Sequence, residues 1–513
     1  AQHLLDAIDA SASSDPDVAE LTVRARGLLE AGSARARSLG SHREAQRLLE
    51  TALVRATPSD RRDQARLHLA AAQVAVDAGA HDRAGWHAQQ ALTDYDDLGM
   101  AIAAGTAAAA LAAARSLSGD HHAAIEVAHP RWLALRGVAG AEPALLRLAA
   151  SLTDAHVYGL GMHDAALEYA DQGILMAESV KDPAALSWFL RLAGSRFQTH
   201  GAPVAAAALY RGAADIARQH NLAQELARAL INQVSLQFGR DLDAALSMGR
   251  ESLEASRRSG VRWSIDASTG NYLLSLWTAS RYEEAKELMS SNRDVAFETG
   301  FRSFRHVMHG WLVDALGADP SWPDEAELGD TATSDDQYLL AGTGQLQMTE
   351  ALQRGDTAEA ADIAEATLAH LVNVMALEDE FAYMWPPLVL AALTAGDVPR
   401  AERLMEPVTS AVEGIVSPHV AAQRDRLQGL IGAARGDDPA TVETDLRAGV
   451  AGLSAFGAIG DAARAEEELA RWLISQDRAD EAGPLLDHVR ATYEQIGALG
   501  WLAQMDSAVD VPG

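Results

Sequence analysis

The stretch Gly201-Ala-Pro-Val-Ala-Ala-Ala-Ala-Leu-Tyr-Arg-Gly-Ala213 sets the pattern for most of the chain. A glycine is followed five residues later by Ala206, four residues further on by the larger Tyr210, and then by the small Ala213. Glycine favours the left-handed backbone that ends a helix, and a small residue lets two crossing helices approach to about 8–10 Å. The stretch therefore predicts the turn and the second helix of a helix pair.

The same pattern returns along the sequence, with 38 to 42 residues between successive alanines in the first half. The paired positions are Gly40 and Ala45, Gly79 and Ala84, Gly119 and Ala124, Gly161 and Ala166, Gly201 and Ala206, Gly239 and Ala244, Ser280 and Ala285, Gly355 and Ala360, Gly396 and Ala401, Gly436 and Thr441, and a variant near Gln476 and Ala482. Regular repetition of this kind predicts a solenoid. We expect an all-α, tetratricopeptide-like α-α solenoid, a right-handed superhelix of about 11–12 helix pairs with units of about 40 residues rather than ~34.

Breaks in the pattern divide the array. Residues 1–15 read as a lead-in segment from an upstream domain, and residues 16–300 as N-terminal helical repeats. Residues 301–345 are irregular: a degenerate unit is expected around Ala326, followed by an acidic mobile loop at 329–336. Residues 346–513 read as C-terminal repeats, in which Pro386 and Pro387 are expected to start a helix.

Composition excludes several functions. The formal net charge is −30 and the only lysines are Lys181 and Lys286, so the basic face that nucleic acid requires is not expected. Cysteine is absent, which excludes disulfides and thiolate chemistry. Apolar runs such as 101–114 are too short or too weakly hydrophobic to span a bilayer, and no signal peptide is recognisable. These features predict a cytoplasmic piece, and a first residue other than methionine suggests a fragment.

Motifs for catalysis or cofactor binding are not recognisable. A phosphate-binding loop needs a lysine after glycine, and neither lysine is so placed. His306 and His309 share one helical face at a spacing that metal sites use, but no carboxylate or cysteine accompanies them in sequence, which favours packing or hydrogen bonding. Paired carboxylates read as solvated helix faces. We therefore expect no catalytic, cofactor-binding or metal-binding residue and no enzymatic activity in this chain.

The candidate site is a surface. In solenoids of helix pairs the first helix of each pair lines the concave face, where partners bind. Aromatic and arginine side chains are favoured contact anchors, and amides can pair with an extended peptide. The alternative for the tryptophans is packing between units. The positions predicted on or near this face are Tyr158, Trp188, Arg191, Gln198, Gln233, Gln237, Asn271, Trp277, His306 and His309.

The two ends of the chain carry a family resemblance. The segments are Leu4-Leu-Asp-Ala-Ile8, Asp15-Pro-Asp-Val-Ala-Glu-Leu21, Ala31-Gly-Ser-Ala-Arg-Ala-Arg-Ser-Leu-Gly40, Glu44-Ala-Gln-Arg-Leu-Leu-Glu-Thr-Ala-Leu53 and Ile496-Gly-Ala-Leu-Gly-Trp501. They resemble the C-terminal tetratricopeptide region of actinobacterial signalling proteins that carry an AAA-like (STAND-type) ATPase. The linked output in these proteins is a class III adenylate/guanylate cyclase or a LuxR-type transcriptional regulator. The family's catalytic and ATP-binding residues lie upstream, so none is carried onto positions here.

The resemblance implies a non-catalytic interaction or sensor module. It would bind a peptide, a protein or a small-molecule effector and regulate the ATPase, cyclase or regulator domains attached in cis, with no direct contact to nucleic acid or membrane. Two alternatives remain open from the sequence: an all-α enzyme of the α/α-toroid type, and a free-standing protein-assembly scaffold.

Overall fold

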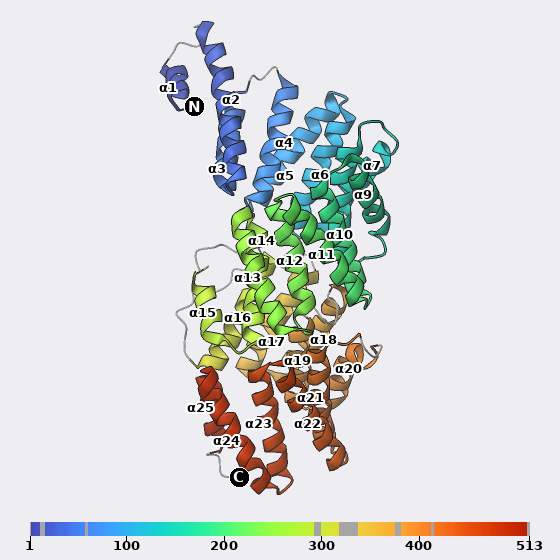
Figure 1. Cartoon of the computed structure of the whole chain (residues 1–513), viewed down its shortest axis with the longest axis vertical. Helices are drawn as coiled ribbons and strands as arrows, with labels where there is room; N and C mark the ends of the chain where they lie inside the picture. The colour runs from blue at the N-terminus through green and yellow to red at the C-terminus, as the bar shows by residue number, and fades with distance from the viewer. Residues whose placement is uncertain are drawn as a thin grey trace. The chain divides into compact units, whose positions relative to one another are not determined.

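The computed structural model is a succession of α-helices (Figure 1). It describes residues 2–10, 16–56, 60–291, 299–317, 337–374, 381–411 and 415–509, and within these ranges no strand occurs. Consecutive helices contact each other from α1 to α9 and again from α15 to α25, as in α2–α3, α4–α5, α17–α18 and α21–α22. This is the architecture of a helical-repeat solenoid, so the predicted fold class is confirmed.

The helices of the described residues have the following bounds: α1 Gln2–Ala10, α2 Pro16–Ser38, α3 His42–Val54, α4 Arg61–Asp77, α5 His81–Asp97, α6 Ala101–Leu117, α7 His121–Leu135, α8 Glu142–Asp154, the π-helix η1 Ala155–Gly159, α9 Leu167–Val180, α10 Pro183–Thr199, α11 Pro203–Gln219, α12 Ala223–Gln237, α13 Leu242–Ser259, α14 Arg262–Thr278, α15 Tyr282–Ser291, α16 Thr299–Leu316, α17 Gln337–Arg354, α18 Thr357–Val374, α19 Phe381–Thr394, α20 Val398–Thr409, α21 Pro418–Arg435, α22 Pro439–Phe456, α23 Ile459–Ser475, α24 Ala479–Ile496 and α25 Leu499–Val509.

The turn at Gly201 has the predicted geometry. Gly201 adopts φ +70° between α10 and α11, and the Ala202 amide donates to the Phe197 carbonyl at 2.8 Å, the pattern that closes a helix with a left-handed residue. Ala206 is fully buried on the following helix. Ser280 takes the glycine's left-handed conformation at φ 57°, as its place in the repeat predicts.

Two anchor positions were off by one residue. The expected anchors were Ala244 and Thr441, but Ala245 and Val442 are the buried residues. The reason is an aspartate cap that fixes where the helix begins: Asp241 accepts from the Ala244 amide at 2.9 Å, and the anchor follows the cap by four residues. Predicting the anchor as the fifth residue after the glycine fails here, because one extra residue lies between the glycine and the aspartate cap.

The expectation that Pro386 and Pro387 start a helix is wrong. Both lie inside α19, which begins at Phe381. A proline in a helix interior removes one backbone hydrogen bond. Phe381 and Trp385 are fully buried in the turn ahead of the prolines with their rings stacked at 5.9 Å, and the Trp385 Nε1 donates to the Leu404 carbonyl at 2.7 Å. Burial of this turn holds it helical ahead of the prolines.

Part of the irregular sequence after residue 300 forms a regular helix. Residues 299–316 form α16, which packs on α17. The degenerate unit proposed around Ala326 and the acidic loop proposed at 329–336 lie outside the described residues. The proposed division at 300 and 345 therefore stays a prediction.

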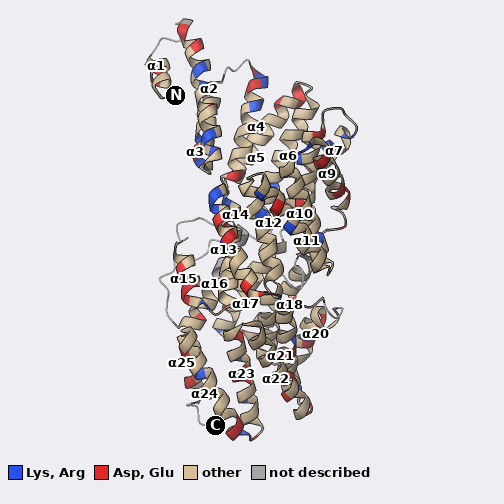
Figure 2. Cartoon of the chain, viewed as in Figure 1, with Lys and Arg blue, Asp and Glu red and all other residues tan. Residues whose placement is uncertain are grey.

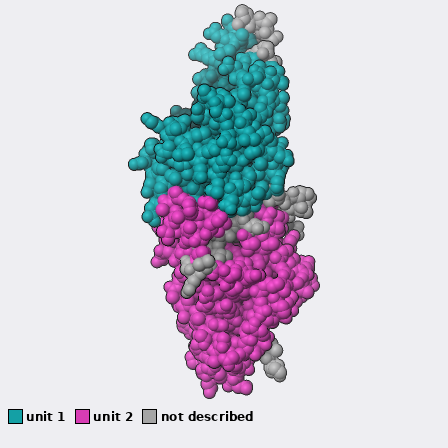
Figure 3. Space-filling model, turned by 90° about the vertical axis from the view of Figure 1, so that its right-hand side faces the viewer, with its two compact units in different colours: residues 1–193, 211–229, 254–265 teal, residues 194–210, 230–253, 266–513 magenta. Residues whose placement is uncertain are grey.

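Contacts divide the chain into two units, coloured separately in Figure 3. Unit 1 comprises residues 1–193, 211–229 and 254–265, and unit 2 comprises residues 194–210, 230–253 and 266–513. The core of unit 1 is rich in alanine around Trp132, Leu148 and Phe189. The core of unit 2 is built around Phe381, Trp385 and Tyr493. Figure 2 shows acidic and basic residues on the helices of both units.

Within unit 2, residues that are far apart in the sequence contact each other. The Gly460 amide donates to Ser280 Oγ at 2.7 Å, and the His419 amide donates to the Gly239 carbonyl at 3.1 Å. The backbone of Gly500 meets the backbone of Gly317. In each of the three pairs the two residues are about 180 positions apart in the sequence, so helices of distant repeats lie against each other within unit 2. Within the described part of the chain, no helix has both the length and the apolar character needed to cross a membrane.

Candidate functional site

A cluster of arginine and tryptophan side chains lies on the first helices of successive pairs in unit 1. Trp188 and Arg191 project from α10, and Arg228 projects from α12. Trp263 comes from the start of α14. Positions 188 and 228 are 40 residues apart, so the repeat places them at equivalent points of neighbouring units. Two of the four, Trp188 and Arg191, are among the residues predicted for the concave face.

The guanidinium of Arg228 packs on both tryptophans. Its Cζ lies 3.8 Å from the centroid of the Trp188 ring and 4.7 Å from that of Trp263. The Cζ of Arg191 lies 4.9 Å from the Trp188 ring. A guanidinium over an indole face is attracted by the ring quadrupole, and this attraction strengthens when the pair is removed from water. The Trp188 indole therefore contacts two guanidinium groups, those of Arg191 and Arg228.

Burial dominates the electrostatics of this cluster. Arg228 is only 8% exposed. Burial, followed by the positive charge of Arg191, lowers the pKa of Arg228 to about 10, so the side chain keeps its charge at neutral pH. Arg191 is paired with Asp154 at 3.8 Å. Among the residues that the structure describes, Arg228 Nε and Nη1 have no hydrogen-bond partner, and neither does Trp188 Nε1.

The carboxylate of the cluster sits beside a helical irregularity. Asp154 is the last residue of α8, and the π-helix η1 follows directly at 155–159. Short π-helical turns occur frequently at functional sites, where they re-aim neighbouring side chains. The backbone of Tyr158, another predicted face residue, lies in η1, but its side chain is outside the described set.

The predicted amides in unit 2 bond to the protein itself. The Tyr210 hydroxyl donates to Gln198 Oε1 at 2.7 Å, and Gln233 Nε2 donates to the Tyr210 carbonyl at 3.0 Å. Asn271 Nδ2 donates to the Ile231 carbonyl at 3.1 Å. Gln237 ends α12 half-buried. At least three of these amides therefore hold neighbouring helices together, which is a structural use of residues predicted to bind a peptide.

Trp277 follows the packing alternative. Its ring centroid lies 4.9 Å from Tyr282, 5.6 Å from Trp311 and 5.9 Å from Trp501. His309 is half-buried on α16, and the side chain of His306 is outside the described set. No group of three histidine or carboxylate side chains suited to a metal ion occurs among the described residues.

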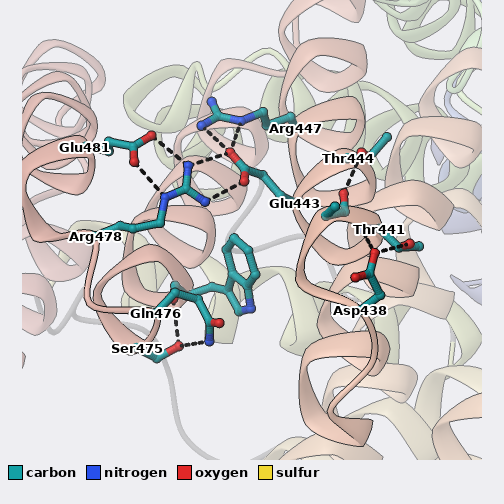
Figure 4. Close-up of polar contacts among 11 residues, drawn as sticks. Asp438, Thr441, Glu443, Thr444, Arg447, Ser475, Gln476, Arg478 and Glu481 are labelled. Atoms are coloured by element: carbon teal, nitrogen blue, oxygen red, sulfur yellow. Dashed lines mark hydrogen bonds and ion pairs between the residues drawn. The ribbon is translucent and has the colours of Figure 1, made fainter.

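A second charged cluster, on α22 and α24 of unit 2, has every charge matched (Figure 4). Glu443 pairs with Arg478 at 2.5 Å and with Arg447 at 2.7 Å, and Arg478 also pairs with Glu481 at 2.6 Å. Hydrogen bonds from Arg478 and Arg447 lower the pKa of Glu443 to about 2. Because these charges satisfy one another, the cluster links two helices and has no charge left for a ligand.

Sequence reasoning missed Arg228, Trp263 and Asp154. The repeat spacing could have identified Arg228, because it lies 40 residues after Trp188, at the equivalent position of the next unit. Trp263 and Asp154 lie near helix ends, where the repeat register gives no warning. Their place in the cluster depends on contacts between neighbouring units, in which Asp154 of α8 pairs with Arg191 and Trp263 of α14 meets Arg228.

No family model and no curated protein sequence matches this chain. Solved structures with a similar course of helices include a Rap protein complexed with competence and sporulation factor, at 10% identity and a TM-score of 0.38, covering 85% of this chain and 99% of that one. The apo form of the quorum sensor NprR from B. thuringiensis is 13% identical, with a TM-score of 0.33 over 78% of this chain and 99% of that one. Yeast Tom70 is 13% identical, with a TM-score of 0.29 over 94% and 96%.

Proposed function

We propose that this chain is a non-catalytic helical-repeat module that binds a peptide or protein segment through unit 1. The observation that carries the proposal is the cluster of Trp188, Arg191, Arg228 and Trp263 on consecutive first helices. Tryptophan and arginine are the residue types that most often dominate the energy of an interface. A set of cations and indoles with one carboxylate favours binding over acid–base catalysis, which supports a module without its own enzymatic activity.

Selection of phage-displayed random dodecapeptides on the immobilised whole chain tests this proposal. We expect sequences to be enriched that also bind as free synthetic peptides in calorimetry. Binding should fall at least tenfold with Trp188→Ala and less with Trp188→Phe, which keeps an aromatic ring. Enrichment that is no greater than on a carrier protein, or affinity unaffected by either variant, would contradict the proposal.

We further propose that binding regulates an attached ATPase with a cyclase or transcription-factor output. The segments at 4–8, 15–21, 31–40 and 496–501 support this through their resemblance to such proteins. Sequencing the gene upstream of the Ala1 codon tests it. We expect a continuous reading frame that encodes a nucleotide-binding domain, and a free-standing repeat gene would refute the proposal.

A further inference from the structure

We infer that Arg228, flanked by Trp188 and Trp263, receives a carboxylate from the bound peptide. The inference rests on the proposed function and adds the chemistry that the ligand must present. The carboxylate has two possible sources, an acidic side chain or the free C-terminus of the peptide. The same guanidinium edge would accept either one.

Arg228 is buried, and two of its three guanidinium nitrogens have no hydrogen-bond partner among the described residues. It is 8% exposed, and the two nitrogens are Nε and Nη1. Taking a guanidinium out of water is costly unless hydrogen bonds to an anion replace the lost hydration. The cation–π contacts with the two indoles use the face of the guanidinium and do not satisfy its Nε and Nη1 hydrogens, which a ligand carboxylate would pair.

Another buried arginine of the same chain shows what Arg228 lacks. Arg426 is 4% exposed, and Glu468 accepts hydrogen bonds from its Nε at 2.7 Å and its Nη2 at 2.6 Å. That bidentate pair is the usual way in which a protein satisfies a buried guanidinium. Arg228 is similarly buried, but no carboxylate of the described residues lies within 4.0 Å of it. The missing group is therefore a carboxylate.

The neighbouring acidic residues are committed elsewhere or too distant. Asp154 pairs with Arg191, and Asp77 pairs with Arg37 at 3.0 Å. Glu225 acts on Arg228 only through long-range charge, and its effect is smaller than the opposing effect of Arg191. A planar carboxylate with a single charge matches the flat edge of one guanidinium better than a phosphate, which is tetrahedral and carries about two charges.

Fluorine NMR of the whole chain labelled with 5-fluorotryptophan tests the inference. Trp188→Phe and Trp263→Phe assign the two resonances. Three probes are titrated to about 20 mM, a range that detects millimolar Kd values. Acetyl-triglutamate amide presents side-chain carboxylates, acetyl-trialanine with a free C-terminus presents a terminal carboxylate, and acetyl-trialanine amide presents none.

We expect at least one carboxylate probe to shift both resonances, and the comparison of the two probes to identify the source. The amide should shift neither. Arg228→Gln should weaken the effect at least tenfold, because a charge-assisted hydrogen bond is lost. Arg211→Gln, at an exposed arginine of α11, is the control with the same change of net charge and should leave binding unchanged. Equal shifts with all three probes, no shift with either carboxylate, or full binding by Arg228→Gln would overturn the inference.

A stability measurement separates binding from a structural role. Arg228→Met keeps a long side chain and removes a buried charge that has no internal partner, so we expect an unchanged or higher Tm together with lost carboxylate binding. A Tm lowered by several degrees would make Arg228 a structural residue and refute the inference. If selected dodecapeptides bind unit 1 with the same affinity after every carboxylate is replaced by an amide, the inference fails while the proposed function stands.

Discussion

The contact between the first turn of α25 and the end of α16 gives a sharp test of how unit 2 is built. Gly500 lies in α25, and a Cβ at this position would fall 2.6 Å from the Gly317 nitrogen and closer still to the Asp314 carbonyl oxygen. Backbone atoms cannot rotate away as a flexible side chain does. Gly500→Ala should therefore push the two helices apart.

The size of the effect follows from the geometry. Restoring ordinary van der Waals contact at about 3.4 Å requires a displacement of ~0.8 Å at the Gly317 nitrogen. The same displacement stretches the hydrogen bonds from Trp501 Nε1 and Gln504 Nε2 to Asp314, now 2.8 and 2.7 Å, to the limit of useful length. Overpacking costs about 1–3 kcal/mol, and stretching the bonds to Asp314 costs about 1–2 kcal/mol, part of the ~1.5–3 kcal/mol that a bond to a charged group contributes, while the helix-propensity gain offsets up to about 1 kcal/mol. We expect α25 docking to weaken by about 2–4 kcal/mol.

Hydrogen–deuterium exchange is the suitable assay, because a repeat array opens locally and does not unfold as one unit. The amides of α25 should exchange about 30- to 700-fold faster in Gly500→Ala. Gly310→Ala is the matched control: Gly310 lies in the interior of α16 with nothing near its Cβ position, so the alanine should slow exchange locally by up to about fivefold. Unchanged protection of α25 in Gly500→Ala would show that this contact does not hold unit 2 together.

Two further predictions concern charged groups of unit 2. Glu468→Gln leaves Arg426 buried without its anionic partner and should destabilise α21 and α23 by about 3–5 kcal/mol in urea or exchange measurements, whereas replacing both residues by Met and Leu should recover most of the loss. Because the pKa of Glu443 is depressed to about 2, its contribution to stability is complete above its ordinary pKa and is lost as pH falls toward 2. The protection factors of α22 and α24 amides, which correct for the intrinsic slowing of exchange in acid, should therefore fall as pH drops from about 5 to about 3, and should fall less in Glu443→Gln.

The sequence predicted the turns well because a turn is a local event. Two turn residues adopt positive φ as predicted. Gly201 is recognisable because it is glycine, and Ser280 is recognisable from its position in the repeat. The prediction failed by one residue at Ala244 and Thr441, where an aspartate cap and not the glycine determines the start of the helix. It also failed at Pro386, because burial of the preceding turn outweighs the preference of proline for a helix start.

The candidate site was predicted only in part, because it depends on packing between repeats. Helical periodicity was enough to place Trp188 and Arg191 on the first helix of a pair. It could not tell that Gln198 Oε1 and Asn271 Nδ2 form hydrogen bonds within the protein, or that Arg228 Nε and Nη1 have no such partner among the described residues. That distinction is set by which carboxylates come within reach when neighbouring helices pack, and no spacing rule in a single sequence encodes it.

The glycines of this chain carry a second constraint that backbone conformation alone does not reveal. Gly260 adopts φ +67° at a turn, which accounts for a glycine, but its Cβ position also falls against the backbone of Gly40 within unit 1. His42 Nε2 bonds the Ser259 carbonyl at 2.9 Å beside this contact. In unit 2, Gly500 does not adopt positive φ, but the backbone of Gly317 lies so close that a side chain at position 500 would clash with it. A turn glycine such as Gly260 thus serves both the end of its own helix and the contact with a repeat far away in sequence.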